Sequence, residues 1–361
     1  MVTISLCMIV KDEEATLDRV LSSVQEIMDE IIIVDTGSID RTKEIARKYT
    51  DRIFDFKWIE DFSAARNFSF SKATKEYILW LDADDIVETE DRSRFHALKA
   101  TLTPDIERVT MPYLLAFDTT GKPTSSLRRN RLVRRDRNFT WVGPVHEYLA
   151  AWGKFLDSDV SITHRKEKVY TDRNLRIYTQ RKEAEEQFSI RDLYYYANEL
   201  REHAKYDDAV VYYDKMLKTG QGWIEDNIQA CVKMSECYSH MGNKEKCFES
   251  LVRALVYEKP RPDVSCAIAG YFFKEEQHEN AVFWYDLATK VPPPSTMGMT
   301  NKSMSTWFPH LQMCLCYDRM GNYEKAYEHN EKALAFNPTH PSMLYNREYF
   351  LNVRKIGDTT A

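Results

Sequence analysis

Hydrophobic and polar positions follow different patterns in the two halves of the chain. In residues 1–165, continuous apolar segments such as 2–10, 30–34 and 77–81 alternate with segments in which apolar residues recur every three or four positions. The clearest of these amphipathic segments covers residues 14–28, with apolar positions at Leu17, Val20, Leu21, Val24 and Ile27. Buried strands separated by amphipathic helices are typical of an α/β protein with a parallel sheet covered on both faces.

The same half contains further predicted elements. Helical patterns occur at 40–49 and 63–74. After residue 104 the apolar segments become longer, at 108–117, 128–135 and 158–163. These longer segments predict that the sheet is completed by a mixed parallel and antiparallel edge.

From about residue 170 the pattern is helical and repeats itself. The small residue that opens the second helix of each unit recurs after 38, 34 and 45 positions, at Ala209, Cys247, Ala281 and Ala326. These spacings are close to the 34-residue period of tetratricopeptide repeats. The dipeptides 242–243 and 321–322, both Gly-Asn, mark the same turn 79 residues apart. We predict four degenerate repeats, a loop at 292–304 and a capping helix at 341–355. A non-repetitive helical bundle is the alternative.

Composition and charge narrow the class of protein. The 361 residues, 43% of them hydrophobic, suffice for two or three domains, and the net charge of −6 argues against a nucleic-acid surface. No apolar segment approaches the roughly 18 residues of a membrane span. The N-terminal segment lacks the basic flank of a signal peptide, so we expect a first strand there, and the cysteine pattern indicates a cytoplasmic location. The seven cysteines form no CxxC pair and predict reduced, buried thiols instead of a zinc site.

The apolar strand at 77–81 ends in three carboxylates, those of Asp82, Asp84 and Asp85. Carboxylate oxygens suit Mg²⁺ or Mn²⁺, and ligands of α/β sheets bind at the carboxyl ends of strands. The segment therefore indicates a divalent cation held against a phosphate. An acidic strand end that only meets water is the alternative. An EF-hand loop is excluded, because Val87 and Ser93 stand where its glycine and final glutamate are required.

The segment Asp35-Thr36-Gly37-Ser38 matches the aspartic-protease signature, but that chemistry needs two such loops and the chain has one. After a strand and before a helix, Asp35 is instead positioned to accept hydrogen bonds from a nucleobase or ribose. Capping of the following helix is the alternative role for this carboxylate.

Four motifs together resemble the family 2 glycosyltransferases of the GT-A fold. In order, they lie at residues 11–14 (KDEE), 33–42 (IVDTGSIDRT), 62–67 (FSAARN) and 81–85 (LDADD). Each is weak alone, but their order is specific and covers residues 1–90. Residues 143–147 (GPVHE) and 162–164 (ITH) resemble the family's acceptor-side segment and closing histidine. With the repeats, the chain is similar to bacterial protein and peptide glycosyltransferases, including the bacteriocin S-glycosyltransferases.

The resemblance implies a domain organisation. An α/β GT-A domain with a Rossmann-like mixed sheet is expected at 1–168, followed by a connecting helix at 169–190. Tetratricopeptide-like helical repeats are expected at 191–340, and a capping helix and tail at 341–361.

The resemblance also implies inverting transfer from a UDP-sugar, with UDP-glucose or UDP-N-acetylglucosamine as the expected donor. The nucleoside would be lined by Ile9, Lys11, Glu13 and Asp35. Arg66 would contact the base or the diphosphate, and Asp82 the ribose. Asp84, with His164 as a further ligand, would bind a Mn²⁺ or Mg²⁺ ion that bridges the phosphates.

An inverting displacement also needs one general base near the acceptor. Glu147 is the predicted base and His146 the second candidate, with Trp141 and Tyr148 nearby to stack against a sugar. The alternatives are a solvated acid for Glu147 and structural roles for His146 and His164.

Residues 128–135 carry five arginines. Strand alternation would send some toward the donor diphosphate, and we expect most of them to face solvent. Arg173 and Arg176, beyond His164, are expected to close over the phosphates.

Three functions remain open from the sequence. The leading hypothesis is a metal-dependent inverting glycosyltransferase whose repeats bind a protein or peptide acceptor. The second keeps the enzyme but replaces the acceptor by a lipid-linked or cell-surface glycan. The third is a repeat scaffold with an inactive transferase domain. The aromatic-rich repeat surfaces also permit a homodimer.

Overall fold

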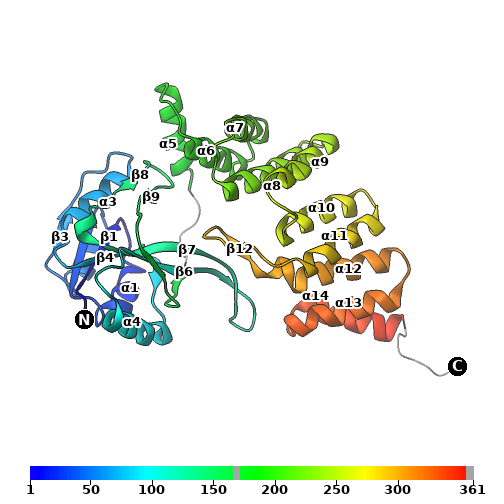
Figure 1. The fold of residues 1–361 in the computed structure, drawn as a ribbon, viewed down its shortest axis with the longest axis horizontal. Helices are drawn as coiled ribbons and strands as arrows, with labels where there is room; N and C mark the ends of the chain where they lie inside the picture. Colours follow the sequence, from blue (N-terminus) through cyan, green and yellow to red (C-terminus); the bar gives the residue numbers. More distant parts are fainter. Residues whose placement is uncertain (166–170, 355–361) are drawn as a thin grey trace. The chain divides into compact units, whose positions relative to one another are not determined.

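The computed structural model describes residues 1–165 and 171–354, which form two units. The first unit comprises Met1–Leu115 and Ser126–Ala184, and the second comprises Ala116–Ser125 and Glu185–Ala361 (Figure 1). The expected domain boundary at 168/169 and the chain after residue 354 lie outside the described residues.

The first unit is built on a mixed sheet, as predicted. Its strands follow one another in the order β3-β2-β1-β4-β7-β6-β11-β5, and β10 pairs with β6. Neighbours from β3 to β4 are parallel, β7 is antiparallel to β4, and β11 is parallel to β6 and antiparallel to β5. The bounds are β1 Ile4–Val10, β2 Glu30–Asp35, β3 Ile53–Asp55, β4 Tyr77–Trp80, β5 Asp85–Ile86, β6 Arg108–Phe117, β7 Pro123–Arg134, β10 Phe155–Asp157 and β11 Ile162–His164.

Alternate residues of the central strands enter two separate cores. On β4, Tyr77 and Leu79 join a core with α1 and α4, while Ile78 and Trp80 join a second core with α3 and the β8–β9 pair. This alternation follows from the two-residue period of a strand. The elements around the sheet are α1 Leu17–Val24, α2 Thr42–Ala46, α3 Phe62–Ser71, α4 Thr89–Thr101, the 3-10 turn Arg135–Arg137, β8 Trp141–Val142, β9 Tyr148–Leu149 and α5 Arg173–Glu183.

Several local predictions need correction. The strand expected at 158–163 begins only at Ile162. Ser158 directly follows β10, and its backbone N–H donates to the carbonyl oxygen of Thr110. Helix α4 was missed because it has few apolar positions, chiefly Phe95 and Leu98. The expected loop at 292–304 contains the short strand β12, Thr300–Asn301, and a 3-10 turn.

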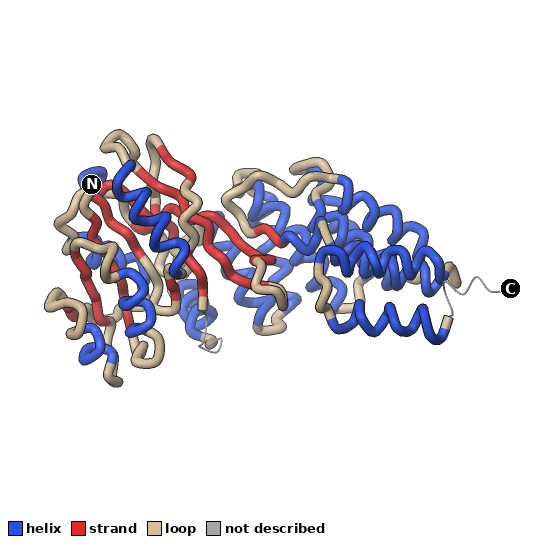
Figure 2. Tube along the Cα trace, turned by 90° about the horizontal axis from the view of Figure 1, so that it is seen from below, coloured by secondary structure: helices blue, strands red, loops and turns tan. Residues whose placement is uncertain are grey.

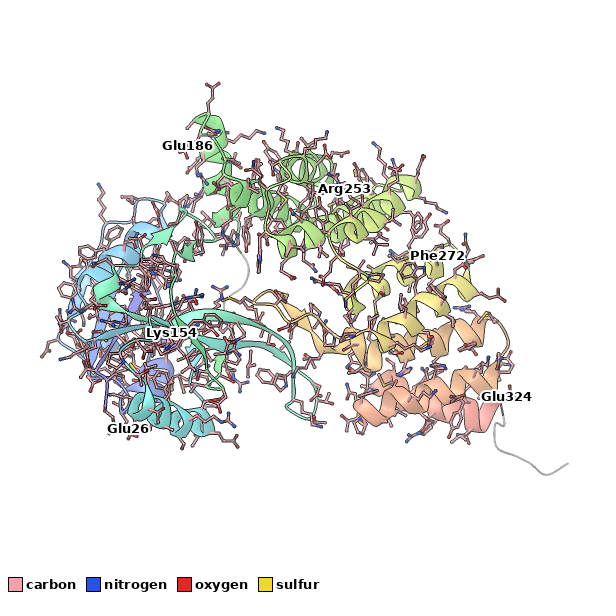
Figure 3. The ribbon with its side chains drawn as sticks, in the orientation of Figure 1. Glu26, Lys154, Glu186, Arg253, Phe272 and Glu324 are labelled. Carbon is pink, nitrogen blue, oxygen red and sulfur yellow. The ribbon has the colours of Figure 1, made fainter. Side chains whose placement is uncertain are left out.

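The second unit consists of paired antiparallel helices that form the predicted tetratricopeptide-like repeats (Figure 2). The pairs are α6 Ile190–Glu202 with α7 Tyr206–Lys218, α8 Ile224–His240 with α9 Lys244–Arg253, α10 Pro262–Lys274 with α11 His278–Lys290, and α12 Trp307–Arg319 with α13 Tyr323–Phe336. They are followed by α14, Pro341–Glu348, and a π-helical turn at Tyr349–Val353. Arg253 of α9, labelled in Figure 3, lies 3.3 Å from Asp214 of α7 and so joins successive repeats.

The recurring sequence positions have a common structural role. Ala209, Ala281 and Ala326 have no exposed surface, and Cys247 is also buried, so each second helix packs closely against its neighbours. Gly242 and Gly321 adopt positive φ angles of 72° and 76° in the inter-helix turns. The asparagine after each glycine caps the next helix by accepting a backbone N–H bond, from Lys246 and Lys325 respectively.

All seven cysteines are free and buried, as predicted. Cys314 and Cys316 lie in different clusters of the repeat unit, on different sides of α12. None of the helices in residues 1–165 and 171–354 combines the length and the apolar character that a bilayer crossing needs.

Candidate active site

The carboxyl ends of β1, β2 and β4 bring the residues of the first, second and fourth motifs to one edge of the sheet. The parallel register sets Ile9 beside Val34 and Val10 beside Asp35. The loop after β1 is bonded to the loop after β2, since the backbone N–H of Asp12 donates to Ser38 Oγ (2.9 Å) and that of Glu13 to Thr42 Oγ1 (2.7 Å). Lys11 is exposed beside these bonds.

Asp35 is buried at this edge, and one of its two carboxylate oxygens accepts no hydrogen bond from the described residues. Its Oδ1 atom accepts hydrogen bonds from the backbone N–H groups of Gly37 (2.8 Å) and Ser38 (2.9 Å), a turn that Gly37 permits with a φ of 108°. Its Oδ2 atom has no hydrogen-bond partner in the described chain. The capping alternative is wrong, because α2 begins at Thr42, whose N–H is bonded by Asp40. A buried acceptor without a partner is suited to a ligand donor group.

The acids after β4 form two groups with different partners. Asp84 and Asp85 meet His164, because β5 pairs antiparallel with β11 and places His164 opposite Asp85. His164 Nδ1 lies 3.4 Å from Asp84 Oδ1 and 3.6 Å from Asp85 Oδ1, and 2.8 Å from the hydroxyl of Tyr113. The two carboxylates raise the pKa of His164 to about 9, although burial opposes the shift.

These three residues fit a divalent cation. Their ligand atoms lie within 4.8 Å of one another, and Asp85 Oδ1 is buried without a hydrogen-bond donor among the described residues. Two carboxylate oxygens and an imidazole nitrogen suit Mn²⁺ or Mg²⁺. The sequence analysis predicts Asp84 and His164 as metal ligands and assigns no role to Asp85.

Asp85 forms a buried ion pair with Arg131 of β7. The Arg131 Nη1 atom lies 3.0 Å from Asp85 Oδ2, and neither side chain has any exposed surface. Asp85 Oδ2 also accepts the backbone N–H of Asp82 at 3.0 Å, which closes the turn between the acids. The expectation that most arginines of 128–135 face solvent is wrong, because only Arg135 of the five is exposed. Arg131 lies close to the rings of Trp80 (3.9 Å) and Tyr113 (4.4 Å).

Asp82 belongs to the second group, together with Arg66 of α3 and Glu147. Arg66 Nη2 donates to Asp82 Oδ1 at 2.7 Å, and Arg66 Nε donates to Glu147 Oε1 at 2.6 Å. The arginine is 10% exposed and lies over the rings of Trp80 and Trp141, at 5.1 and 4.7 Å. Although burial opposes ionisation of Asp82, Arg66 and Arg131 lower the pKa of this carboxyl below its ordinary value.

The 143–147 loop, which connects β8 to β9, supplies both candidate bases. Glu147 is 11% exposed, so the alternative of a solvated acid is wrong. The ring of His146 stacks on Tyr178 of α5, with 6.4 Å between centroids. Trp141 cannot stack on a sugar, because it is 4% exposed and packs edge-on against Trp80, whereas Tyr148 is exposed.

Helix α5 adds a further arginine beside this group. Arg173 lies 4.6 Å from the ring of Phe62, and Arg176 pairs with Glu60 at 3.3 Å. Burial lowers the pKa of Arg173, while the carboxylates of Glu147 and Glu60 oppose the shift. Arg173 therefore lies within electrostatic range of the candidate base.

Comparison with known proteins identifies the unit that carries this site. Residues 5–102 match Glycosyl transferase family 2. These residues of the N-terminal unit are a family 2 glycosyltransferase domain. A TPR repeat-containing protein of Synechococcus elongatus is 36% identical over 152 residues, which are 41% of this chain and 35% of that protein. The SPbeta prophage-derived glycosyltransferase SunS of Bacillus subtilis is 32% identical over 148 residues, 40% of this chain and 34% of that protein.

These matches are partial, because the aligned stretches span about a third of the length of the curated relatives. Among solved structures, the TPR protein YrrB, described as having an unusual peptide-binding site, covers 50% of this chain and 85% of its own, with 16% identity and a TM-score of 0.37.

Proposed function

We propose that this protein is an inverting, metal-dependent glycosyltransferase that moves a sugar, glucose or N-acetylglucosamine, from its UDP conjugate to a protein or peptide acceptor. One observation carries the proposal. In the unit whose residues 5–102 match family 2, the end of β4 separates a candidate cation group (Asp84, Asp85, His164) from an arginine-held carboxylate (Glu147).

The first group suits the leaving diphosphate. A cation held by Asp84, Asp85 and His164 would neutralise the charge that develops on the departing UDP. The residues themselves are fixed before the reaction, since Arg131 and the Asp82 backbone hold Asp85, and Tyr113 holds His164. Preorganised groups of this kind stabilise charge without reorganisation during the reaction.

The second group suits activation of the acceptor. The acceptor nucleophile attacks the anomeric carbon, the bond from that carbon to UDP breaks, and Glu147 takes the acceptor's proton. Arg66 orients Glu147 through Oε1, so that Oε2 remains for the acceptor proton. Asp35 with its unbonded Oδ2, Ile9, Lys11 and Glu13 supports a nucleoside site at the neighbouring strand ends.

The direct test measures UDP release from a panel of UDP-sugars with Mn²⁺, Mg²⁺ or a chelator, followed by intact-mass analysis of candidate peptides. We expect metal-dependent release that Asp84→Asn abolishes and that the exposed control Asp105→Asn preserves. Metal-independent release, or activity that survives Asp84→Asn, would refute the metal role.

The acceptor is tested in the same experiment. A hexose-sized adduct on a peptide supports the protein or peptide acceptor, while transfer only to lipid-linked or cell-surface glycans refutes it. Absence of any nucleotide-sugar binding by calorimetry would identify the chain as a repeat scaffold.

A further inference from the structure

Two arginines of β7 face the same side of the sheet next to the acids. Arg129 and Arg131 are two positions apart, and side chains of a strand alternate between its faces. Both lie near the same two rings, since Arg129 is 5.9 Å from Trp80 and 5.3 Å from Tyr113. The two guanidinium groups therefore line one surface, although the sequence alone did not distinguish them from their neighbours.

The strand register sets Arg129 level with the end of β4. Leu79 of β4 pairs with Leu132 of β7 in the antiparallel ladder. Continuing this register by three residues brings Arg129 opposite Asp82, the first acid after the strand.

The two arginines differ in what they bind. Arg131 is committed to Asp85 at 3.0 Å. Arg129 makes neither a hydrogen bond nor an ion pair with the described residues. Its Nε atom is buried without an acceptor, as are Nε and Nη2 of Arg131, so the two arginines differ in the ion pair that Arg131 makes. The buried Nε donor of Arg129 has lost water without gaining a partner, which is costly. The arrangement is suited to an anion that arrives with the ligand.

The position also favours a phosphate over other anions. The guanidinium of Arg129 lies over the ring of Tyr113, and the hydroxyl of the same tyrosine contacts His164. The side chain of Tyr113 alone therefore separates the arginine from the candidate cation group. Cation and guanidinium together suit a group with several anionic oxygens, and the fork of arginine matches two phosphate oxygens at once.

We propose that Arg129 binds a phosphate of the donor's diphosphate. The inference rests on the proposed function, because it takes a nucleoside diphosphate as the leaving group. It assigns a substrate-binding role to one arginine of the 128–135 segment and a structural role to Arg131.

The test compares the binding of UDP, uridine and inorganic pyrophosphate by titration calorimetry at one fixed Mg²⁺ concentration. We expect Arg129→Gln to bind UDP and pyrophosphate about 10- to 100-fold more weakly, because the phosphate loses one charged hydrogen-bonding partner. The affinity for uridine should not change. The UDP and pyrophosphate affinities of Arg129→Lys should lie between those of the unmodified protein and Arg129→Gln, since lysine keeps the charge but loses the two parallel donors of arginine. Arg135→Gln, an exposed arginine just beyond β7, is the matched control and should change none of the three.

Each outcome decides between the proposals. Unchanged UDP and pyrophosphate binding in Arg129→Gln overturns the role of Arg129, as does an equal loss of uridine binding. If the unmodified protein binds pyrophosphate through Arg129 but not UDP, the inference stands and the UDP donor is wrong. If the unmodified protein binds neither phosphate compound, both proposals are wrong.

Discussion

Asp85 and Arg131 form an ion pair of 3.0 Å in which neither side chain is exposed. The pair joins the turn after β4 to β7, 46 residues later in the chain. Because Asp85 Oδ2 also accepts the backbone N–H of Asp82, the pair fixes the path of the acidic segment. Its role is to hold the site's geometry, and its removal is expected to act on stability first.

Replacing Arg131 by Met leaves the Asp85 carboxylate buried without its counter-ion, which typically costs about 3–5 kcal/mol of unfolding free energy. The double variant Arg131→Met/Asp85→Asn should recover part of that loss, because no buried charge then remains. Denaturant unfolding measures both. The exposed pair Arg134–Asp136 is the control, and Asp136→Asn should cost about 0–1 kcal/mol. A loss for Arg131→Met no larger than that of the control would contradict the assignment.

Substituting Glu147 and His146 one at a time shows which of the two is the general base. If Glu147 is the base, Glu147→Gln should lower the transfer rate by about 10²- to 10⁴-fold while UDP affinity is kept. His146→Gln should have a much smaller effect, since its ring stacks on Tyr178. Rate constants at saturating donor, with UDP binding measured separately, check both. The opposite ranking would transfer the role to His146.

Asp35→Asn tests the nucleoside site. The amide oxygen can still accept the bonds from Gly37 and Ser38, so the turn should survive, but the free Oδ2 acceptor becomes a donor. We expect uridine and UDP to bind about 10- to 100-fold more weakly and pyrophosphate to bind unchanged. Arg129→Gln should also weaken UDP binding, but with the opposite effects on uridine and pyrophosphate. Equal weakening of pyrophosphate would indicate a general disturbance of the loop.

The repeat unit should lose stability in mild acid. His329 of α13 lies beside His310 of α12, with 3.2 Å between their Nδ1 atoms. Burial and the neighbouring His310 lower the pKa of His329 from 6.5 to about 4. Lys332 acts in the same direction, while Glu328 and Asp286 oppose it. Between these values the unfolded chain binds a proton that the folded chain does not, so the unfolding free energy falls as the pH drops.

His329→Gln should reduce this pH dependence by about 2 kcal/mol between pH 6.5 and 4, a value below the full shift because the ring is only partly buried. Far-UV circular dichroism of unfolding at several pH values measures it. His96→Gln, an exposed histidine on α4, serves as the control. Identical pH profiles for His329→Gln and the unmodified protein would exclude this pair as the cause.

The sequence predicted most elements because their signals are local. The apolar segments 30–34 and 77–81 and the small residues at Ala209 and Ala326 each specify an element through neighbours a few positions away. Helix α4 and the two-residue strand β5 carry little such signal. They are set by packing against the rest of the first unit, and the sequence did not reveal them.

The candidate site shows the same division. The sequence by itself determined which residue types end the strands, including Asp35, Asp82 and Asp84, and the order of motifs that identifies the family. Only the tertiary structure decided their partners: Arg66 meets Glu147 across 81 positions, and the pairing of β5 with β11 brings His164 to the acids. The physical reason is that strand ends follow from local periodicity, whereas contacts between distant strands depend on sheet order and register, which the whole fold sets.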